Sequence, residues 1–383
     1  MFKRLLLLVL CLPAAAMACS FPNVSFTANF ETGRLGDCQA LATDSYLLTV
    51  VPEQKRLNPS PWFHFKVTPK KPELLHIKMA FSGFKPRYLP KISHDHKHWQ
   101  EIAFTTEGNT MSFDLKLGSK PLWVAGQPPF YNEQYTTWLK DKAKQSPDAH
   151  FSLLGKSAEG RPLYQVIRQK PGNHEWVVIV GRQHPPEVTG ADALLAFVDT
   201  LFTRSAESKA FFNRFNLILI PDLNPDGVAH GNWRDTSQKQ DLNRDWGNFS
   251  QAESRLVRDK LASLTKHGDR IVYGLDFHST RYDIFYTMPK SDELHPADLT
   301  ATWLTALGKR TDWIEKPSIK PGTHPNSGVF KQFIADTYHV HGVTYEVGDN
   351  TPLALIRYLG AQAADSFMKT LLATPPTAFT AAK

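Results

Sequence analysis

Short apolar runs alternate with stretches of helical periodicity from about residue 128 onward, and this alternation limits what the chain can fold into. Short, nearly uninterrupted apolar runs are typical of buried parallel strands. Three such runs are Trp176–Val180, Leu217–Ile220 and Ile271–Leu275. Helical patterns lie between and after them, at about 189–203, 251–265 and 352–372. The alternation predicts an α/β domain over residues 128–374, with a mixed, mostly parallel sheet flanked by helices.

Residues 19–127 have a different pattern, with strand-like segments and few helical periods. These segments are rich in β-branched and aromatic residues, or they alternate apolar with polar residues as half-buried strands do. The clearest are Tyr46–Val51, Trp62–Val67, Leu75–Met79 and Met111–Leu115. This part is predicted to be a small antiparallel β-sandwich domain. Residues 375–383, which begin with Pro375 and Pro376, are predicted to form a frayed tail.

The first 18 residues have the features of a secretory signal peptide. Lys3 and Arg4 give a positive start, Leu5–Leu12 is an apolar run, and Ala16–Ala18 matches a small-x-small cleavage site. The apolar run is too short to span a bilayer permanently, and no second run of the required length follows. We therefore expect a protein that is exported, either periplasmic or secreted, without a transmembrane segment. A composition of 42% hydrophobic and 21% charged residues excludes disorder as its main state.

Cleavage of the signal peptide would remove Cys11 and leave Cys19 and Cys38. In an oxidising compartment two such cysteines most simply form one disulfide that ties down the N-terminus. The alternative is a lipid anchor on Cys19, the first residue after the cleavage site, although Ala16 stands where lipoprotein signals usually carry leucine. Loss of Lys3 and Arg4 lowers the formal charge from +7 to +5 (7 − 2). This mild basicity favours acidic partners without identifying one, and no feature indicates nucleic-acid binding.

Polar residues follow two of the predicted strands, at the place where α/β proteins build their sites. His184 and Glu187 lie in the loop after the first apolar run, and Pro185 and Pro186 restrict the turn between them. His278 follows the third run. A His–Glu pair at this spacing is often an ordinary surface pair, and a strand-end histidine is often structural. Two histidines and a glutamate with an open fourth position, however, form a catalytic zinc site.

Further polar residues could act beside such a metal. Arg244 suits a terminal carboxylate, because a guanidinium binds it through two parallel hydrogen bonds and the amide of Asn243 adds a third. Asp241 could orient a zinc-binding histidine through its other ring nitrogen. Glu346 stands inside the apolar run Val343–Val347, where a carboxylate is costly unless it is paired or used. With three ligands already named, we interpret Glu346 as a general base.

Taken together, residues 130–370 resemble the zinc carboxypeptidases of the carboxypeptidase A type. The motifs His-x-x-Glu, Arg, Asn-Arg, His and Glu occur in the order found in that family. The nearest likeness is to the cytosolic carboxypeptidase-like branch, in which a β-sandwich precedes the catalytic domain. Trp62–Val67 is similar to a sandwich strand of that branch, and Asn224–Val228 with Gly231 and Asn232 is similar to its catalytic loop. The resemblance implies the zinc carboxypeptidase fold for the α/β domain.

The resemblance also implies a zinc-dependent hydrolysis. His184, Glu187 and His278 match the zinc ligands of the family. Glu346 matches the general base, which deprotonates a zinc-bound water. Asp241 would then hydrogen-bond to a zinc-binding histidine without contacting the metal itself.

Two more residues match those that select a chain end, and a third matches one that stabilises the reacting carbonyl. Asn243 and Arg244 match the pair that binds the substrate carboxylate, and Arg234 matches the arginine that stabilises the oxyanion. The implied function is an exported zinc metallocarboxypeptidase that hydrolyses C-terminal peptide bonds in peptides or proteins. Residues 322–328 lack the tyrosine that digestive members carry in this region, a departure that bears on substrate fit rather than on the chemistry.

Other interpretations stay open. An amidohydrolase that removes an acyl group from an amino acid shares the metal motif, and export also suits a periplasmic carboxypeptidase of peptidoglycan peptides. An inactive binding module is disfavoured by the complete set of ligands and base. Lys331 lies in the segment expected to line the side-chain pocket, so acidic C-terminal residues are a hypothetical substrate. His94, His96 and His98 could bind a second metal, although a polar loop is the simpler interpretation.

Overall fold

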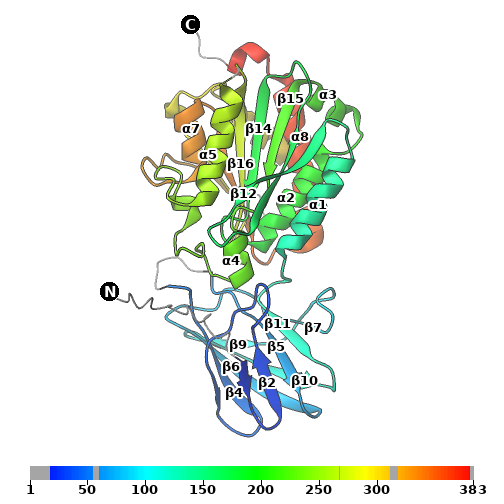
Figure 1. Ribbon diagram of the computed structural model, residues 1–383, viewed down its shortest axis with the longest axis vertical. Coiled ribbons are helices and arrows are strands. Elements are labelled where there is room, and N and C mark those ends of the chain that lie inside the picture. Colours follow the sequence, from blue (N-terminus) through cyan, green and yellow to red (C-terminus); the bar gives the residue numbers. More distant parts are fainter. Residues whose placement is uncertain (1–17, 55–59, 267, 311–317, 380–383) are drawn as a thin grey trace, which may run out of the picture.

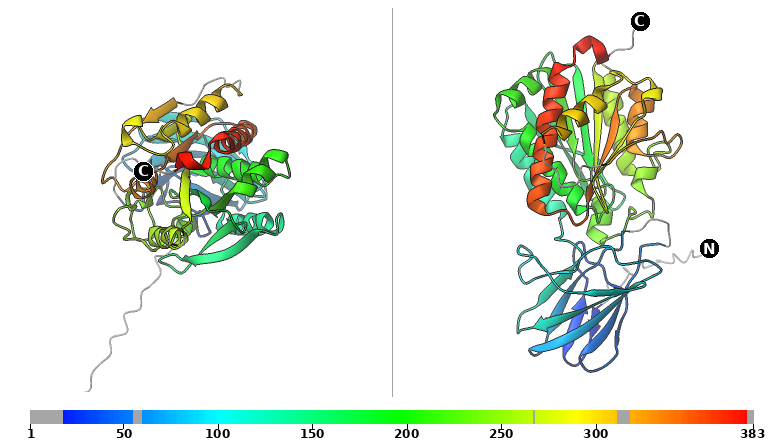
Figure 2. Two further views of the ribbon diagram at one scale, coloured as in Figure 1. Left: turned by 90° about the horizontal axis from the view of Figure 1, so that it is seen from above. Right: turned by 180° about the vertical axis from the view of Figure 1, so that it is seen from behind.

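The computed structural model describes residues 18–54, 60–266, 268–310 and 318–379. The predicted signal peptide lies outside these residues except for Ala18, which begins the first strand. A β-sandwich and an α/β body follow one another along the long axis of the molecule (Figure 1; a view from behind is in Figure 2). Among the described residues, no helix combines the length and the apolar character that crossing a membrane requires.

The sandwich consists of two sheets, with strand orders β1-β2-β5-β11-β7-β8 and β3-β4-β6-β10-β9. The strands are β1 (Ala18–Ser20), β2 (Val24–Thr27), β3 (Cys38–Ala40), β4 (Ser45–Val50), β5 (His64–Pro69), β6 (Glu73–Phe81), β7 (Lys91–Ser93), β8 (Gln100–Glu101), β9 (Thr105–Glu107), β10 (Thr110–Leu117) and β11 (Leu122–Ala125). Alternate apolar side chains such as Phe65 and Ile77 are buried in one core, because successive residues of a strand point to opposite faces. The predicted antiparallel pairing holds except between β4 and β6, which are parallel because the chain visits the other sheet as β5 between them.

Cys19 and Cys38 form a disulfide with their Cα atoms 6.0 Å apart, as predicted. It joins β1 to β3, and therefore an edge strand of one sheet to an edge strand of the other. A lipid anchor would need the same Sγ of Cys19, so the disulfide-bonded form of the chain cannot carry one.

The α/β body is built on an eight-stranded sheet of order β12-β13-β15-β14-β16-β19-β17-β18. Its strands are β12 (Ala149–Lys156), β13 (Pro162–Arg168), β14 (Glu175–Gly181), β15 (Phe215–Ile220), β16 (Arg270–Thr280), β17 (Ile284–Thr287), β18 (Ser318–Pro321) and β19 (Gly342–Gly348). The central strands β15, β14, β16 and β19 are parallel neighbours, and β12, β13 and β17 add antiparallel pairs. The three predicted buried strands are β14, β15 and β16, which confirms the mixed, mostly parallel sheet.

Helices cover both faces of this sheet. One face carries α1 (Asn132–Lys144), α2 (Val188–Leu201), α3 (Ala206–Arg214), α6 (Leu299–Gly308) and α8 (Leu353–Ala373). The other face carries α5 (Ala252–Thr265) and α7 (Phe330–Tyr338). The predicted helical stretches are α2, α5 and α8. Shorter helical turns are α4 (Pro225–His230), η1 (Leu242–Arg244), η2 (Lys290–Asp292) and η3 (Pro376–Phe379).

The prediction of a frayed tail is wrong up to Phe379. The turn η3 returns the chain to the body, where the Phe379 ring is buried and lies 6.4 Å from the ring of Phe215. Burial of an aromatic ring offsets the entropy of ordering these few residues. Residues 380–383 lie outside the described part of the chain.

The central strands end beside the sandwich (Figure 1). Side chains of the two parts contact each other there. Arg87 of the sandwich donates to both carboxylate oxygens of Asp349, just after β19, over 2.6 and 3.0 Å. It also donates to the carbonyl of Ser279 on β16 over 3.1 Å. Trp233, which follows α4, is buried in the core of the sandwich and donates from Nε1 to the carbonyl of Trp62 over 2.9 Å.

Candidate metal centre

A tight turn between β14 and α2 brings His184 and Glu187 together. Arg182 holds this turn with a backbone φ of 52° and with a hydrogen bond of 2.8 Å from Nε to the carbonyl of Pro185. Its Nη1 also donates to the hydroxyl of Tyr135 over 3.1 Å. The side chains of His184 and Glu187 consequently meet, with 2.8 Å between His184 Nδ1 and Glu187 Oε1.

His278 reaches the same point from β16. Its Nδ1 lies 2.7 Å from Glu187 Oε2 and 3.2 Å from His184 Nδ1. Helix α2 packs closely on β16 because Gly190 has no side chain, and a Cβ there would lie 2.3 Å from the carbonyl oxygen of His278. The structure thus unites the three predicted ligands, with one ligand atom of each within 4.8 Å of the others. No other group of this kind occurs among the described residues.

Two aspartates orient the histidine rings. Asp241 Oδ1 lies 3.0 Å from His184 Nε2, and Asp276 Oδ2 lies 2.7 Å from His278 Nε2. These contacts favour a proton on each Nε2 and leave the Nδ1 lone pairs directed at the centre of the group. The sequence indicated Asp241 but not Asp276, which stands two residues before His278 and so on the same face of its strand.

The charges around the three ligands favour a cation at their centre. Burial alone would lower the pKa of His278, but the carboxylates of Asp276 and Glu187 raise it well above its usual value. Burial would raise the pKa of Glu187, but His184 and His278 hold it well below its usual value. Two imidazole nitrogens and a carboxylate are also a donor set that zinc takes in catalytic sites. The residues present therefore fit a zinc ion.

Glu346 lies beside this group on the neighbouring strand. His278 and Glu346 are partners in the register of β16 and β19, so their side chains project from the same face of the sheet. Oε2 of Glu346 is buried and has no hydrogen-bond partner among the described residues. Burial, followed by the negative charge of Glu187, raises the pKa of the Glu346 carboxyl to about 7. A carboxyl group in this environment can exchange a proton near neutral pH.

A cavity of about 260 Å³ opens beside the ligands. Its walls include six of the residues predicted from the sequence, namely His184, Glu187, Arg234, Asn243, Arg244 and Glu346. The structure therefore places two of the three predicted ligands, the predicted base, the oxyanion arginine and the carboxylate-binding pair around one small hollow, with His278 in contact with those two ligands.

The polar residues of the α4–η1 region are linked to one another. Arg234 Nε donates to Asp241 Oδ2 over 2.5 Å, and Asp241 Oδ1 accepts the backbone amide of Asn243 over 2.9 Å. Oδ1 of the buried Asn243 side chain accepts the backbone amide of Phe330 over 2.9 Å. Arg244 is exposed, and its Nη1 donates to the carbonyl of Asn243 over 2.6 Å.

The cavity also has a basic wall. Lys331 is only 3% exposed, and its Nζ donates to the carbonyls of Thr287, over 3.3 Å, and Gly322. Burial lowers the pKa of Lys331 to about 8. Burial, then the positive charges of Lys331 and Arg244, lowers the pKa of His324, which lines the same wall.

Arg87 and Tyr286 are among the lining residues that were not found from the sequence. Arg87 belongs to the sandwich and reaches the cavity only through the packing of the two parts of the chain. Tyr286 lies on β17, where it is paired with Thr344 of β19 and so faces the same side as the central site residues. A short aromatic run such as that of β17 predicts a strand, but it does not indicate that one of its side chains lines the cavity.

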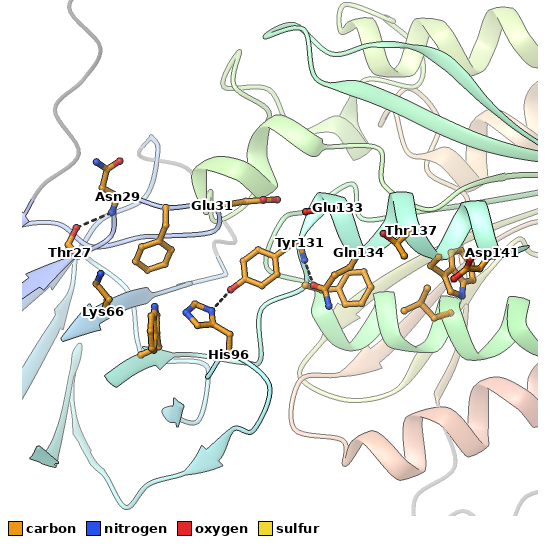
Figure 3. A pocket seen from close by; sticks show the side chains of 15 residues that line it. Thr27, Asn29, Glu31, Lys66, His96, Tyr131, Glu133, Gln134, Thr137 and Asp141 are labelled. Atoms are coloured by element: carbon orange, nitrogen blue, oxygen red, sulfur yellow. Dashed lines mark hydrogen bonds between the residues drawn. The ribbon is translucent and has the colours of Figure 1, made fainter. Parts of the chain in front are cut away.

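His94, His96 and His98 do not come together. They lie in bends after β7 rather than on a strand, and each uses Nδ1 for a different partner: the carbonyl of Pro121, the hydroxyl of Tyr131 and the carboxylate of Asp95, respectively. The hypothesis of a second metal site there is therefore wrong. His96 instead lines a hollow of about 1150 Å³ between the sandwich and α1, which contains none of the ligands (Figure 3).

Comparisons with known sequences agree with this site. Residues 135–349, more than half of the chain, match the family model described as zinc carboxypeptidase. An uncharacterised protein of Zymomonas mobilis is 25% identical over 57% of this chain and 58% of its own length. Human cytosolic carboxypeptidase 2 is 24% identical over 68% of this chain but only 33% of its own length. The chain thus spans less than two thirds of the relatives that it matches.

Solved structures share the whole architecture. The metallo-carboxypeptidase of Burkholderia cenocepacia superposes with a TM-score of 0.77 at 20% identity, over 91% of this chain and 98% of that one. The metallo-carboxypeptidase of Pseudomonas aeruginosa, in complex with (2-guanidinoethylmercapto)succinic acid, gives a TM-score of 0.73 at 20% identity over 90% and 98%. At this identity the structures establish the fold, and the match of the family model establishes the lineage. The chain belongs to the zinc carboxypeptidase family.

Proposed function

We propose that this chain is a zinc-dependent carboxypeptidase that removes residues from the carboxyl end of peptides. The observation that carries the proposal is one small cavity beside the His–Glu–His group, lined by two of its members, by Glu346 with its buried Oε2 and by several basic side chains. A metal site with an adjacent base can hydrolyse an amide bond, and the basic residues select an anionic chain end.

His184, Glu187 and His278 are the proposed zinc ligands. When bound there, zinc supplies a Lewis acid that lowers the pKa of water and polarises a carbonyl group. Glu346 takes the proton of the water that attacks the last peptide carbonyl, and it then gives a proton to the amine that leaves when the C–N bond breaks. The lack of a hydrogen-bond partner for Oε2 among the described residues supports this role, because the oxygen can accept a proton.

Arg234 is the proposed stabiliser of the oxyanion. Its guanidinium lines the cavity, and its Nε is held by Asp241, so the group is already oriented before the substrate carbonyl gains charge. Donors that are fixed in advance stabilise a developing charge more than donors that must reorganise.

Asn243 and Arg244 are the proposed residues that bind the substrate carboxylate. Asn243 Nδ2 lies 3.4 Å from His278 Nε2. When Nε2 carries a proton, it donates that proton in a hydrogen bond to Asp276 and cannot accept one from Nδ2. The amide therefore keeps a donor for a carboxylate, and the exposed guanidinium of Arg244 supplies a charge-assisted pair of hydrogen bonds.

Replacing Arg244 with alanine is expected to raise KM for peptides about 10- to 100-fold, about the value of one hydrogen bond to a charged group. The kcat should change much less, because the carboxylate takes no part in bond cleavage and is bound alike in the ground state and in the transition state. Steady-state kinetics on a peptide and on its C-terminal amide provide the check. Unaltered KM, or an equal loss for the amidated peptide, would contradict the role of Arg244.

The buried Lys331 supports a preference for acidic C-terminal residues. Because burial lowers its pKa to about 8, Lys331 is charged below this pH and neutral above it. The preference for C-terminal Glu over Leu should therefore be present at pH 6.5 to 7, roughly a unit or more below that pKa, and weaken as the pH rises through about 8. Lys331→Met should reduce the preference about 10-fold at neutral pH.

The ratio of kcat/KM for matched Glu and Leu peptides measures this preference across the pH range. Lys209→Met, a substitution of an exposed lysine on α3, is the control for loss of one positive charge. A Glu preference that survives in Lys331→Met would remove Lys331 from this role.

A peptide library tests the proposed activity as a whole. Release of C-terminal residues should be seen, and it should stop with a chelator. Cleavage of N-acyl amino acids alone would favour the amidohydrolase, and a strong selection of peptidoglycan peptides would favour a role in the cell wall. Absence of hydrolysis with zinc bound would refute the proposal.

The predicted signal peptide and the Cys19–Cys38 disulfide support export to the periplasm or the outside.

A further inference from the structure

The loop that carries Arg234 is anchored by a carboxylate of the sandwich. Three consecutive backbone amides, those of Trp233, Arg234 and Asp235, donate to Glu53 over 2.7, 2.9 and 2.7 Å. The Glu53 side chain is 9% exposed. Amides that converge on an ionised carboxylate make strong hydrogen bonds, because the acceptor is charged and the donors are fixed by the backbone.

The rest of this loop is also attached to the sandwich. The indole of Trp233 is 1% exposed within the core of the sandwich. Arg34 donates from Nη1 to the side chain of Asn232 over 3.3 Å, and its Nη2 lies 3.8 Å from Glu53. The conformation of the loop is thus determined by the preceding domain rather than by the α/β body alone.

A chain of hydrogen bonds links Glu53 to the proposed metal ligands. The backbone of Arg234 is held by Glu53 and its Nε by Asp241, while Asp241 also lies 3.0 Å from Nε2 of His184. Glu53 is therefore connected to a proposed ligand through two residues, although it is not among the residues that line the cavity beside the ligands.

We propose that Glu53 is a positioning residue for the hydrolysis, which acts by fixing the guanidinium of Arg234. The proposal rests on the role given to Arg234 under the proposed function. The sandwich then contributes to catalysis, because the position of the oxyanion arginine depends on a side chain from this other domain. Small displacements of a catalytic group are costly, and an error of about 1 Å can lower the rate about 100-fold.

The test replaces Glu53 with glutamine. The amide keeps one oxygen acceptor but presents an NH₂ group to the amide of Trp233 or of its neighbours, so at least one hydrogen bond becomes a repulsive contact. We expect kcat to fall 10- to 100-fold, while KM stays within about 2-fold and the zinc content of the purified protein stays at one ion per chain. Glu73→Gln is the matched control, because Glu73 lies in the same domain and accepts its hydrogen bonds from the side chain of Asn23.

Coupling to Arg234 separates positioning from general stability. In the Arg234→Ala background, Glu53→Gln should lower kcat little further, because the group that it positions is gone. Multiplicative losses in the double variant would overturn the proposal, as would a normal kcat in Glu53→Gln. If Glu53→Gln does not fold, Glu53→Asp, which keeps the charge but shortens the side chain, provides the same cycle. A normal kcat in Arg234→Ala alone would instead refute the proposed role of Arg234, which keeps the two failures distinct.

Discussion

Replacing Glu346 with glutamine should lower kcat by about four powers of ten, the upper range for loss of a general acid–base group. The amide has nearly the same shape as the carboxyl group but cannot take a proton from water. Because Glu346 is assigned both the uptake of a proton from water and its delivery to the amine, one substitution removes both steps. The measurement is kcat for a peptide that the parent protein cleaves well.

The metal should remain in the Glu346→Gln variant. Glu346 is not one of the three proposed ligands, and its Oε2 makes no hydrogen bond to a described residue that the substitution would break. Zinc content and thermal unfolding of the variant should therefore match those of the parent. A variant that turns over normally would remove Glu346 from its role. A variant that loses zinc would show that the loss of activity comes from the missing metal rather than from the missing base.

Removal of zinc should abolish peptide hydrolysis and lower the free energy of unfolding. His184, Glu187 and His278 are all buried, and the charges around them favour a cation. Zinc that binds only the folded chain stabilises it by about 4 kcal/mol when its free concentration is about 1,000 times its Kd. Activity and the unfolding transition, measured before and after dialysis against a chelator, give both quantities.

A ligand variant provides the control for zinc removal. His278→Ala deletes one ligand, so a chelator should shift the unfolding of this variant much less than that of the parent. Addition of zinc to the dialysed parent should restore both activity and stability. Hydrolysis that persists after the metal has been removed would exclude the proposed chemistry.

The local sequence pattern is sufficient to predict the strands that carry the proposed ligands. Apolar runs of strand length indicate burial on both faces, and the residues that follow parallel strands meet at one edge of the sheet. The amino-acid sequence is therefore enough to relate His184, Glu187 and His278 to one another. Glu346 is noticeable for a similar reason, because a carboxylate in an apolar strand is costly unless it has a function.

Other expectations fail where contacts distant in sequence decide the outcome. Pro375 and Pro376 oppose a helix and so predict a frayed tail, yet burial of Phe379 orders the chain up to that residue. The alternating histidines after β7 resemble metal ligands, but they lie in bends and their rings bind different partners. The spacing of residues along the chain does not reveal such packing.

The sequence by itself determined the central strands, the proposed ligands and the proposed base, because strand periodicity and strand ends are local features. The tertiary structure alone decided which further side chains line the cavity or contact its residues from elsewhere. Arg87 and Glu53 come from the sandwich, and Asp276 and Tyr286 come from strand positions that carry no motif. Their importance lies in distances to residues far along the chain, and such distances exist only once the sandwich and the α/β body have packed together.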